Sequence, residues 1–196
     1  QSGCCRRRMQ KIIHNKEERS MKKITAAVLA IITLMTAMLL AGCKTSAVEV
    51  PSGMKIVSSD AEAFYLFVPM TWVTNTSSGA ASAYYSDKDR SNVSMTCMVS
   101  EDVTTVDDYV KKCQAELAAL FDSFTPVGEV TDAVIGERNG KCFEYTAKIG
   151  ETEYKYRQIV VIYKNLFYVF TYTSTPEGFD LHTDDVDNIV SKIRFK

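Results

Sequence analysis

The sequence predicts an α+β fold, an α/β/α sandwich in which a mostly antiparallel meander sheet lies between two main helices. Apolar residues recur at helical spacing in residues 104–121 and 184–191. Strand-like segments separated by short turn signals fill the region between them. Two of these, QIVVIY and LFYVF, are apolar on both faces, so the sheet needs a cover on both sides. A helix on each face of one sheet meets that need.

The segment before the first helix is rich in residues that favour strands. Residues 64–68, FYLFV, form a β-prone run stopped by Pro69, which predicts a strand at an edge of the sheet or ending there. Tyr84 and Tyr85 continue the strand pattern. In residues 93–99, Val93, Met95, Cys97 and Val99 share one face, so we expect a half-buried strand there.

Residues 104–121 have the clearest helical period in the chain. The recurring residues are Val106, Tyr109, Val110, Cys113, Leu117 and Leu120. Thr104 or Thr105 can cap the start, and Asp107 and Asp108 suit the positive end of the helix dipole.

A meander is predicted after this helix, with strands at residues 130–137, 142–149, 153–163 and 166–172. We expect turns at Asn139-Gly140, Gly150-Glu151 and Lys164-Asn165, of which the Asn-Gly pair is the strongest hairpin signal. Residues 184–191 supply the second helix, and KIRFK forms a short extended end.

The N-terminal quarter of the sequence has the architecture of an export signal. Met21, Lys22 and Lys23 precede residues 24–40, which carry no charge and end in Leu40-Ala41-Gly42-Cys43. This ending resembles the lipobox of bacterial lipoprotein precursors. The resemblance implies that a signal peptidase recognises Leu40, Ala41 and Gly42, and that Cys43 carries a diacylglyceryl group at the cell membrane, facing outside the cytoplasm. The alternative is an uncleaved membrane-spanning helix, for which the apolar run is slightly short.

This interpretation divides the sequence into four segments. Residues 1–20 are expected to be an upstream extension that is not native, and residues 21–42 the lipoprotein signal peptide. Residues 43–53 form a polar tether, and residues 54–196 form one domain.

The expected mature chain is acidic. The sequence has 23 basic and 24 acidic residues; the first 42 positions hold 8 and 2 of them, which leaves 15 and 22, a net charge near −7. Such a domain is poorly suited to gripping phosphate backbones, so we expect no nucleic-acid partner.

The domain also resembles the PsbP-like family, named for an extrinsic subunit of photosystem II. The resemblance spans residues 56–195 and depends on Pro69, Trp72, Gly140, Ile189, Ser191, Ile193 and Phe195. It implies an α/β/α sandwich. The family includes assembly factors, a nuclear-import factor and bacterial lipoproteins, so the resemblance implies no catalytic or ligand residue.

Few residues suit catalysis or metal binding. His182 is the single histidine after Cys43, so a Ser-His-Asp triad would need it, and no Gly-x-Ser-x-Gly motif is present. Asp184, Asp185 and Asp187 beside His182 can bind a hard cation. Acids at a helix start more often complement its dipole, so we expect no metal site and no cofactor.

Two further groups of residues are candidate sites. Cys97, Cys113 and Cys142 can form one disulfide or stay as buried thiols. Tyr154 and Tyr156 share one face of their strand, where they can line a ligand or partner surface or belong to the rim of the core.

The sequence therefore predicts a non-enzymatic, lipid-anchored binding or assembly lipoprotein outside the cytoplasm. Its expected partners are the membrane, through the lipid, and an envelope protein or a small ligand. One alternative is a cell-envelope hydrolase using carboxylates such as Glu144 and Glu153 facing each other across the meander. Another is a metal-binding lipoprotein.

Overall fold

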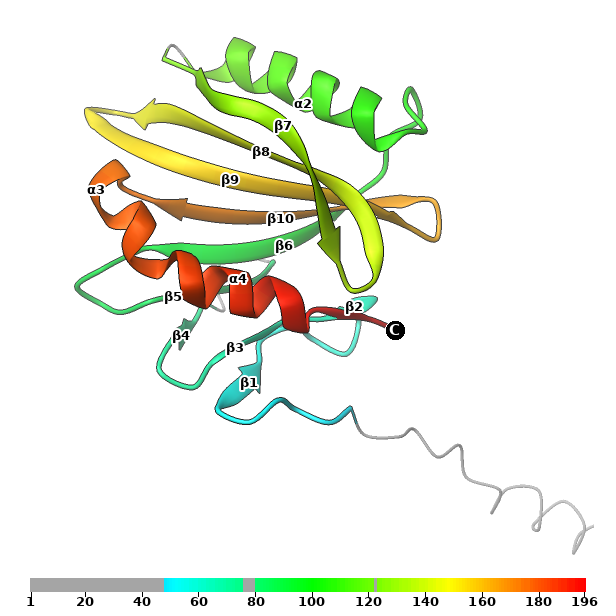
Figure 1. Ribbon diagram of the computed structural model, residues 1–196, viewed down its shortest axis with the longest axis vertical. Helices are drawn as coiled ribbons and strands as arrows, with labels where there is room; N and C mark the ends of the chain where they lie inside the picture. The colour runs from blue at the N-terminus through cyan, green and yellow to red at the C-terminus, as the bar shows by residue number, and fades with distance from the viewer. Residues whose placement is uncertain (1–47, 76–79, 122) are drawn as a thin grey trace, which may run out of the picture. The chain divides into compact units, whose positions relative to one another are not determined.

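An antiparallel sheet of seven strands forms the centre of the domain (Figure 1). The computed structural model describes residues 48–75, 80–121 and 123–196. The strands, in spatial order, are β4 (Val73–Thr74), β5 (Ala81–Tyr84), β6 (Asn92–Met98), β10 (Leu166–Ser174), β9 (Thr152–Tyr163), β8 (Arg138–Ile149) and β7 (Thr125–Ile135). The strands β7 to β10 form a meander, and β10 then pairs with β6. The predicted α+β class with an antiparallel meander is confirmed.

Helix α2 (Val106–Leu120) covers one face of the sheet. Thr105 caps it, since its hydroxyl accepts a hydrogen bond from the backbone N–H of Asp108 at 3.1 Å. Tyr109 stacks on Phe167 of β10, with 4.1 Å between ring centroids, and the core here continues through Phe143 and Val160. The helical period of residues 104–121 thus predicted this element correctly.

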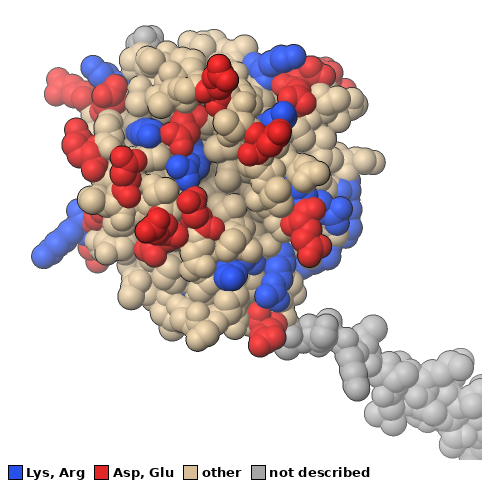
Figure 2. Space-filling model, viewed as in Figure 1, with Lys and Arg blue, Asp and Glu red and all other residues tan. Residues whose placement is uncertain are grey.

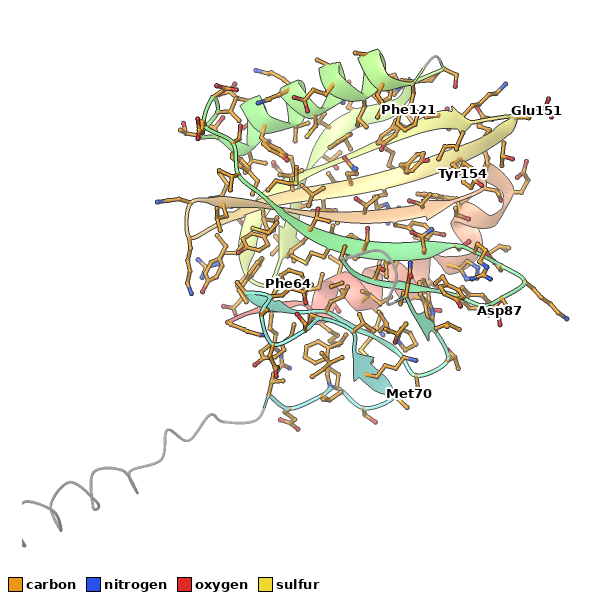
Figure 3. The ribbon with its side chains drawn as sticks, turned by 180° about the vertical axis from the view of Figure 1, so that it is seen from behind. Phe64, Met70, Asp87, Phe121, Glu151 and Tyr154 are labelled. Atoms are coloured by element: carbon orange, nitrogen blue, oxygen red, sulfur yellow. The ribbon has the colours of Figure 1, made fainter. Side chains whose placement is uncertain are left out.

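The opposite face is covered by α3 (Pro176–Phe179), the 3₁₀ helix η1 (Asp180–His182) and α4 (Thr183–Lys192). Helix α4 lies in front of the sheet in Figure 1 and behind it in Figure 3. Its Val186 and Ile189 are fully buried, as is the following Ile193 at 1% exposure. Both faces of β9 and β10 are therefore covered, as their unbroken apolar runs predict.

The FYLFV run does not form one strand, which corrects the prediction of a single strand in this run. It is divided between β2 (Phe64–Tyr65), which pairs with β11 (Arg194–Phe195), and β3 (Phe67–Pro69), which pairs with β1 (Met54–Ile56). Leu66, between β2 and β3, is fully buried, and its N–H donates to the hydroxyl of Ser58 at 3.0 Å. The run is continuously apolar because nearly every residue in it is buried.

The first meander turn lies three residues before its predicted position. Gly136 and Glu137, with φ of 53° and 66°, form the two-residue loop between Ile135 and Arg138, so the prediction of a turn at Asn139-Gly140 is wrong. Gly140 lies inside β8, where a Cβ would come 2.0 Å from the carbonyl oxygen of Val160. The lack of a side chain at Gly140 therefore lets β8 and β9 pack closely, and Gly140 forms no turn. The later turns at Gly150-Glu151 and Lys164-Asn165 lie where they were predicted.

Candidate functional site

The predicted lipidation residue Cys43 and the recognition residues Leu40, Ala41 and Gly42 lie outside the described residues. Their roles stay predictions. No helix in the described part of the chain is both long enough and apolar enough to cross a membrane.

The two tyrosines predicted to form a ligand or partner surface lie beneath the end of α2. Tyr156 is only 8% exposed and stacks on Tyr145, with 4.7 Å between ring centroids. Tyr154 is partly exposed, and Figure 3 shows it on the same side of the sheet as Phe121. Because most of Tyr156 belongs to the core, only Tyr154 offers its ring to a partner; a binding role for the pair stays a prediction.

The acidic residues of α4, considered above as metal ligands, point to separate partners. Asp185 accepts a hydrogen bond from the indole N–H of Trp72 at 3.3 Å, and Asp187 accepts one from Arg157 at 3.0 Å. His182 binds Asp89 instead. Within the residues that the structure describes, no three or more His, Cys, Asp and Glu side chains gather closely enough to hold a metal ion. The contacts of Asp185 and Asp187 fasten α4 to the rest of the domain.

His182 is buried and forms a polar chain with residues that sequence reasoning did not single out. Its Nε2 lies 2.7 Å from Oδ2 of Asp89, whose Oδ1 accepts hydrogen bonds from the Ser91 hydroxyl at 2.6 Å and backbone N–H at 2.9 Å. The Ser91 hydroxyl also lies 2.8 Å from that of Ser174. A catalytic triad places histidine between serine and acid, whereas here the acid lies in the middle. The arrangement therefore joins η1 to the loop between β5 and β6.

The pKa of Asp89 is shifted by this environment. Burial raises the pKa, but the hydrogen bonds from Ser91 and His182 outweigh burial, so the pKa lies below its ordinary value. The carboxylate form of Asp89 is thus the form that the fold stabilises.

Glu144 and Glu153 do not face each other, which corrects the arrangement expected for a carboxylate enzyme. In the register of β8 and β9, Glu144 lies opposite Arg157 and Glu153 lies opposite Lys148. Glu144 accepts from Arg157 Nε at 2.8 Å and pairs with Lys155 Nζ at 3.1 Å. With Arg157 and Lys155 beside it, Glu144 forms a structural ion-pair cluster between β8 and β9.

The three cysteines after Cys43 are free thiols in the structure, and Cys97 is exposed, so the prediction of a buried thiol at this position is wrong. Cys142 lies on the α4 side of β8, whereas Cys113 lies on the sheet-facing side of α2. Burial raises the pKa of both thiols, which keeps them protonated and weakly nucleophilic.

A groove that sequence reasoning missed lies between α2 and the strands β6, β9 and β10. We call it the α2 groove; its volume is 270 Å³. Its apolar rim is formed by Met98, Cys113, Leu117 and Leu120, and its polar floor by Thr96, Gln158 and Thr171. Leu120 is 73% exposed and Met98 is 46% exposed. The sequence places Leu120 in the apolar period of the helix, so nothing in the sequence indicated that it would be exposed at this groove.

The fold has counterparts among solved structures, at low sequence identity. No protein-family model and no curated protein sequence matches the chain. A protein of unknown function from Pseudomonas aeruginosa, PA94, described as a putative regulator, is 14% identical with a TM-score of 0.51, over 71% of this chain and 94% of that one. Cyanobacterial PsbP (CyanoP) from Synechocystis sp. PCC 6803 is 13% identical with a TM-score of 0.52, over 79% of this chain and 98% of that one.

A weaker likeness is to LpqN of Mycobacterium tuberculosis, which is described as involved in cell envelope biogenesis. It is 11% identical with a TM-score of 0.44, over 76% of this chain and 82% of that one, a score too low to bear on function. The two structures with TM-scores above 0.5 show the fold alone: the domain has the α+β architecture of PsbP-like proteins.

Proposed function

We propose that the chain is an envelope lipoprotein that binds a partner protein through the α2 groove and catalyses no reaction. A diacylglyceryl group on Cys43 holds the domain outside the cytoplasm in this proposal. The observation that carries the binding function is the α2 groove itself, where Leu120 and Met98 expose apolar surface beside a polar floor.

The size of the α2 groove favours a protein partner over a small ligand. Small-molecule sites usually enclose about 300 to 1,000 Å³. At 270 Å³, the groove lies just below this range and has room for one or two inserted side chains of a partner. Met98 at the rim adds a flexible side chain that adapts to such a contact.

The negative charge at the α2 groove restricts the kind of partner further. Glu116 lines the α2 groove and is exposed. We therefore infer a partner segment that carries an apolar side chain next to a basic one. Such a segment would fill the groove and meet Glu116 at its rim.

The tether limits where this partner can lie. Residues 43–53, fully extended, span at most roughly 40 Å. A domain held by such a tether reaches only proteins near the membrane surface, so the partner is an envelope protein.

Site-specific photo-cross-linking tests the binding function. A photoreactive residue is placed at Leu120 or, as the matched control, at Leu181 in η1, because these leucines are 73% and 75% exposed. We expect position 120 alone to give one adduct of defined mass in intact cells. The adduct should disappear when Met98→Lys is added, and its cross-linked peptide should hold an apolar residue beside Lys or Arg.

Either of two results would contradict the proposal. One is that positions 120 and 181 give the same adducts, which would indicate random collisions. The other is that position 120 gives no adduct while the protein is present at the membrane in normal amount.

A further inference from the structure

A second hollow, separate from the α2 groove, lies where the β7–β8 turn meets the C-terminal segment. We call it the arginine hollow; its volume is 610 Å³. Gly136 and Arg138 line it from the turn, and Arg194 and Phe195 line it from β11. Tyr163 of β9 forms part of its floor, with its ring centroid 4.6 Å from that of Phe195.

The walls of this hollow are held in place by close packing. A Cβ on Gly136 would lie 3.0 Å from Phe195 Cδ2 and 3.1 Å from the carbonyl oxygen of Ile193, so the turn fits tightly against the C-terminal segment. The Tyr163 hydroxyl donates to the carbonyl oxygen of Lys196 and secures the same segment. The hollow is therefore pre-formed, as ligand sites usually are.

Two arginines in the hollow differ from the other arginines of the described chain. Arg90 pairs with Asp87 at 3.3 Å, and Arg157 pairs with Glu144 and Asp187. Among the described residues, Arg138 and Arg194 have no acidic partner. Each contacts an aromatic ring: Arg138 lies 5.0 Å from the ring centroid of Tyr163, which lines the hollow, and Arg194 lies 5.9 Å from that of Phe67, which lies outside it.

Stacking on a ring leaves the N–H donors of a guanidinium free at its edge. Each arginine carries five donors in a fork that matches phosphate and carboxylate oxygens. Among the described residues, Glu137 is the one acidic residue that lines the hollow, so the two arginines leave it positive. Lys164 adds a further positive charge close by, 4.9 Å from the Tyr163 centroid.

This local charge contrasts with the acidic composition of the chain after Cys43. In Figure 2, Lys and Arg gather at the side of the domain where Figure 1 shows the β7–β8 turn and the C-terminus. Lys192, in the last turn of α4, already complements the negative end of that helix. The helix dipole therefore does not require the two hollow-lining arginines.

We propose that the arginine hollow binds a phosphate group attached to an apolar or aromatic body. Arg138 and Arg194 would hold the phosphate, and Tyr163, Phe195, Val134 and Val190 would contact the body. The hollow is large enough for a small molecule, unlike the α2 groove. Such a phosphate comes either from an anionic phospholipid headgroup or from a soluble phosphate ester.

Arginine footprinting on the membrane-reconstituted protein tests the site. An arginine-specific dicarbonyl reagent is applied to protein in phosphatidylcholine vesicles, with excess inorganic phosphate or with chloride at the same ionic strength. A second arm uses vesicles that also contain phosphatidylglycerol, without added phosphate. Peptide mapping then gives the modification rate at each arginine, and Arg90 is the internal control because it is exposed and already paired.

We expect modification of Arg138 and Arg194 to slow by about fivefold or more in at least one arm, while Arg90 is unaffected. Protection by inorganic phosphate indicates a soluble ester, and protection by phosphatidylglycerol alone indicates a lipid headgroup. The variant Arg194→Gln should remove the protection of Arg138, whereas Arg90→Gln should leave it intact. Unprotected arginines in both arms, or equal slowing at Arg90, would overturn the proposal.

Discussion

At the residue scale, Glu144 shows how burial determines the contribution of an ion pair to folding stability. Arg157 binds two carboxylates at almost equal distances, Glu144 at 2.8 Å and Asp187 at 3.0 Å. The Glu144 side chain is 21% exposed and that of Asp187 is 64% exposed. An exposed pair contributes little, whereas removing one partner of a buried pair leaves the other without compensation.

We expect Glu144→Gln to lower the free energy of unfolding by about 2 kcal/mol, because Arg157 and Lys155 lose their shared anion. Asp187→Asn, which alters the exposed contact of the same arginine, should cost less than about 1 kcal/mol. Chemical denaturation of both variants measures the difference. Equal losses of unfolding free energy would show that burial does not determine how much these ion pairs stabilise the fold. A larger loss for Asp187→Asn would show that the exposed pair stabilises the fold more than the buried pair.

At the scale of elements, the register of β8 on β9 depends on Gly140. The carbonyl oxygen of Val160 occupies the position that any side chain at residue 140 would need. Asn139-Gly140 nevertheless has the stronger local turn signal, so the packing of neighbouring strands overrides the local preference.

Gly140→Ala should destabilise the domain by about 3 kcal/mol or more, since the added Cβ meets backbone rather than a movable side chain. Gly53→Ala is the matched control: nothing lies within 4 Å of its Cβ position, and its cost arises from φ of 75° alone. That cost should be about 1 kcal/mol. Thermal or urea unfolding compares them, and a Gly140→Ala variant as stable as Gly53→Ala would contradict the register described here.

The attachment of η1 and α4 to the loop between β5 and β6 should depend on pH. The pKa of Asp89 is lower in the folded chain than the unfolded value of about 3.9. Its ionised form therefore stabilises the fold above about pH 4, and this contribution is lost as pH falls through the folded-state pKa.

The variant Asp89→Asn tests this dependence. The difference in unfolding free energy between wild type and Asp89→Asn should be fully present at about pH 5 and should shrink at about pH 2, as pH falls through the folded-state pKa of Asp89. Asp87→Asn, at a side chain 80% exposed two residues earlier, should show almost no difference at either pH. A loss for Asp89→Asn that stays constant over this range would indicate a role for Asp89 that does not involve its charge.

At the scale of the whole molecule, periodicity predicted the layers because each period reflects which face is buried. The helical spacing of residues 106–120 and the two-sided apolar runs of β9 and β10 indicate a sheet covered on both faces. Contacts between distant segments leave no such signal. Trp72 donates to Asp185, 113 positions later, and His182 binds Asp89, 93 positions earlier.

The two hollows were unpredictable for the same reason. The α2 groove exists because α2 leaves part of β6 and β10 uncovered, which depends on where the helix crosses the sheet. The arginine hollow joins Arg138 to Arg194, two residues that share no pattern in the sequence. The acidic residues near His182 were candidates for metal binding. In the structure, Asp185, Asp187 and His182 instead form hydrogen bonds that hold η1 and α4 in place.

Intact mass spectrometry of the membrane-fraction protein, beside a Cys43→Ser variant, tests most directly the claim that the domain works from a lipid anchor. We predict a chain that begins at Cys43 and carries a diacylglyceryl adduct, and we predict that the variant lacks both features. An unmodified chain that retains residues 24–42 would contradict the lipoprotein proposal and would leave a membrane-spanning segment as the anchor.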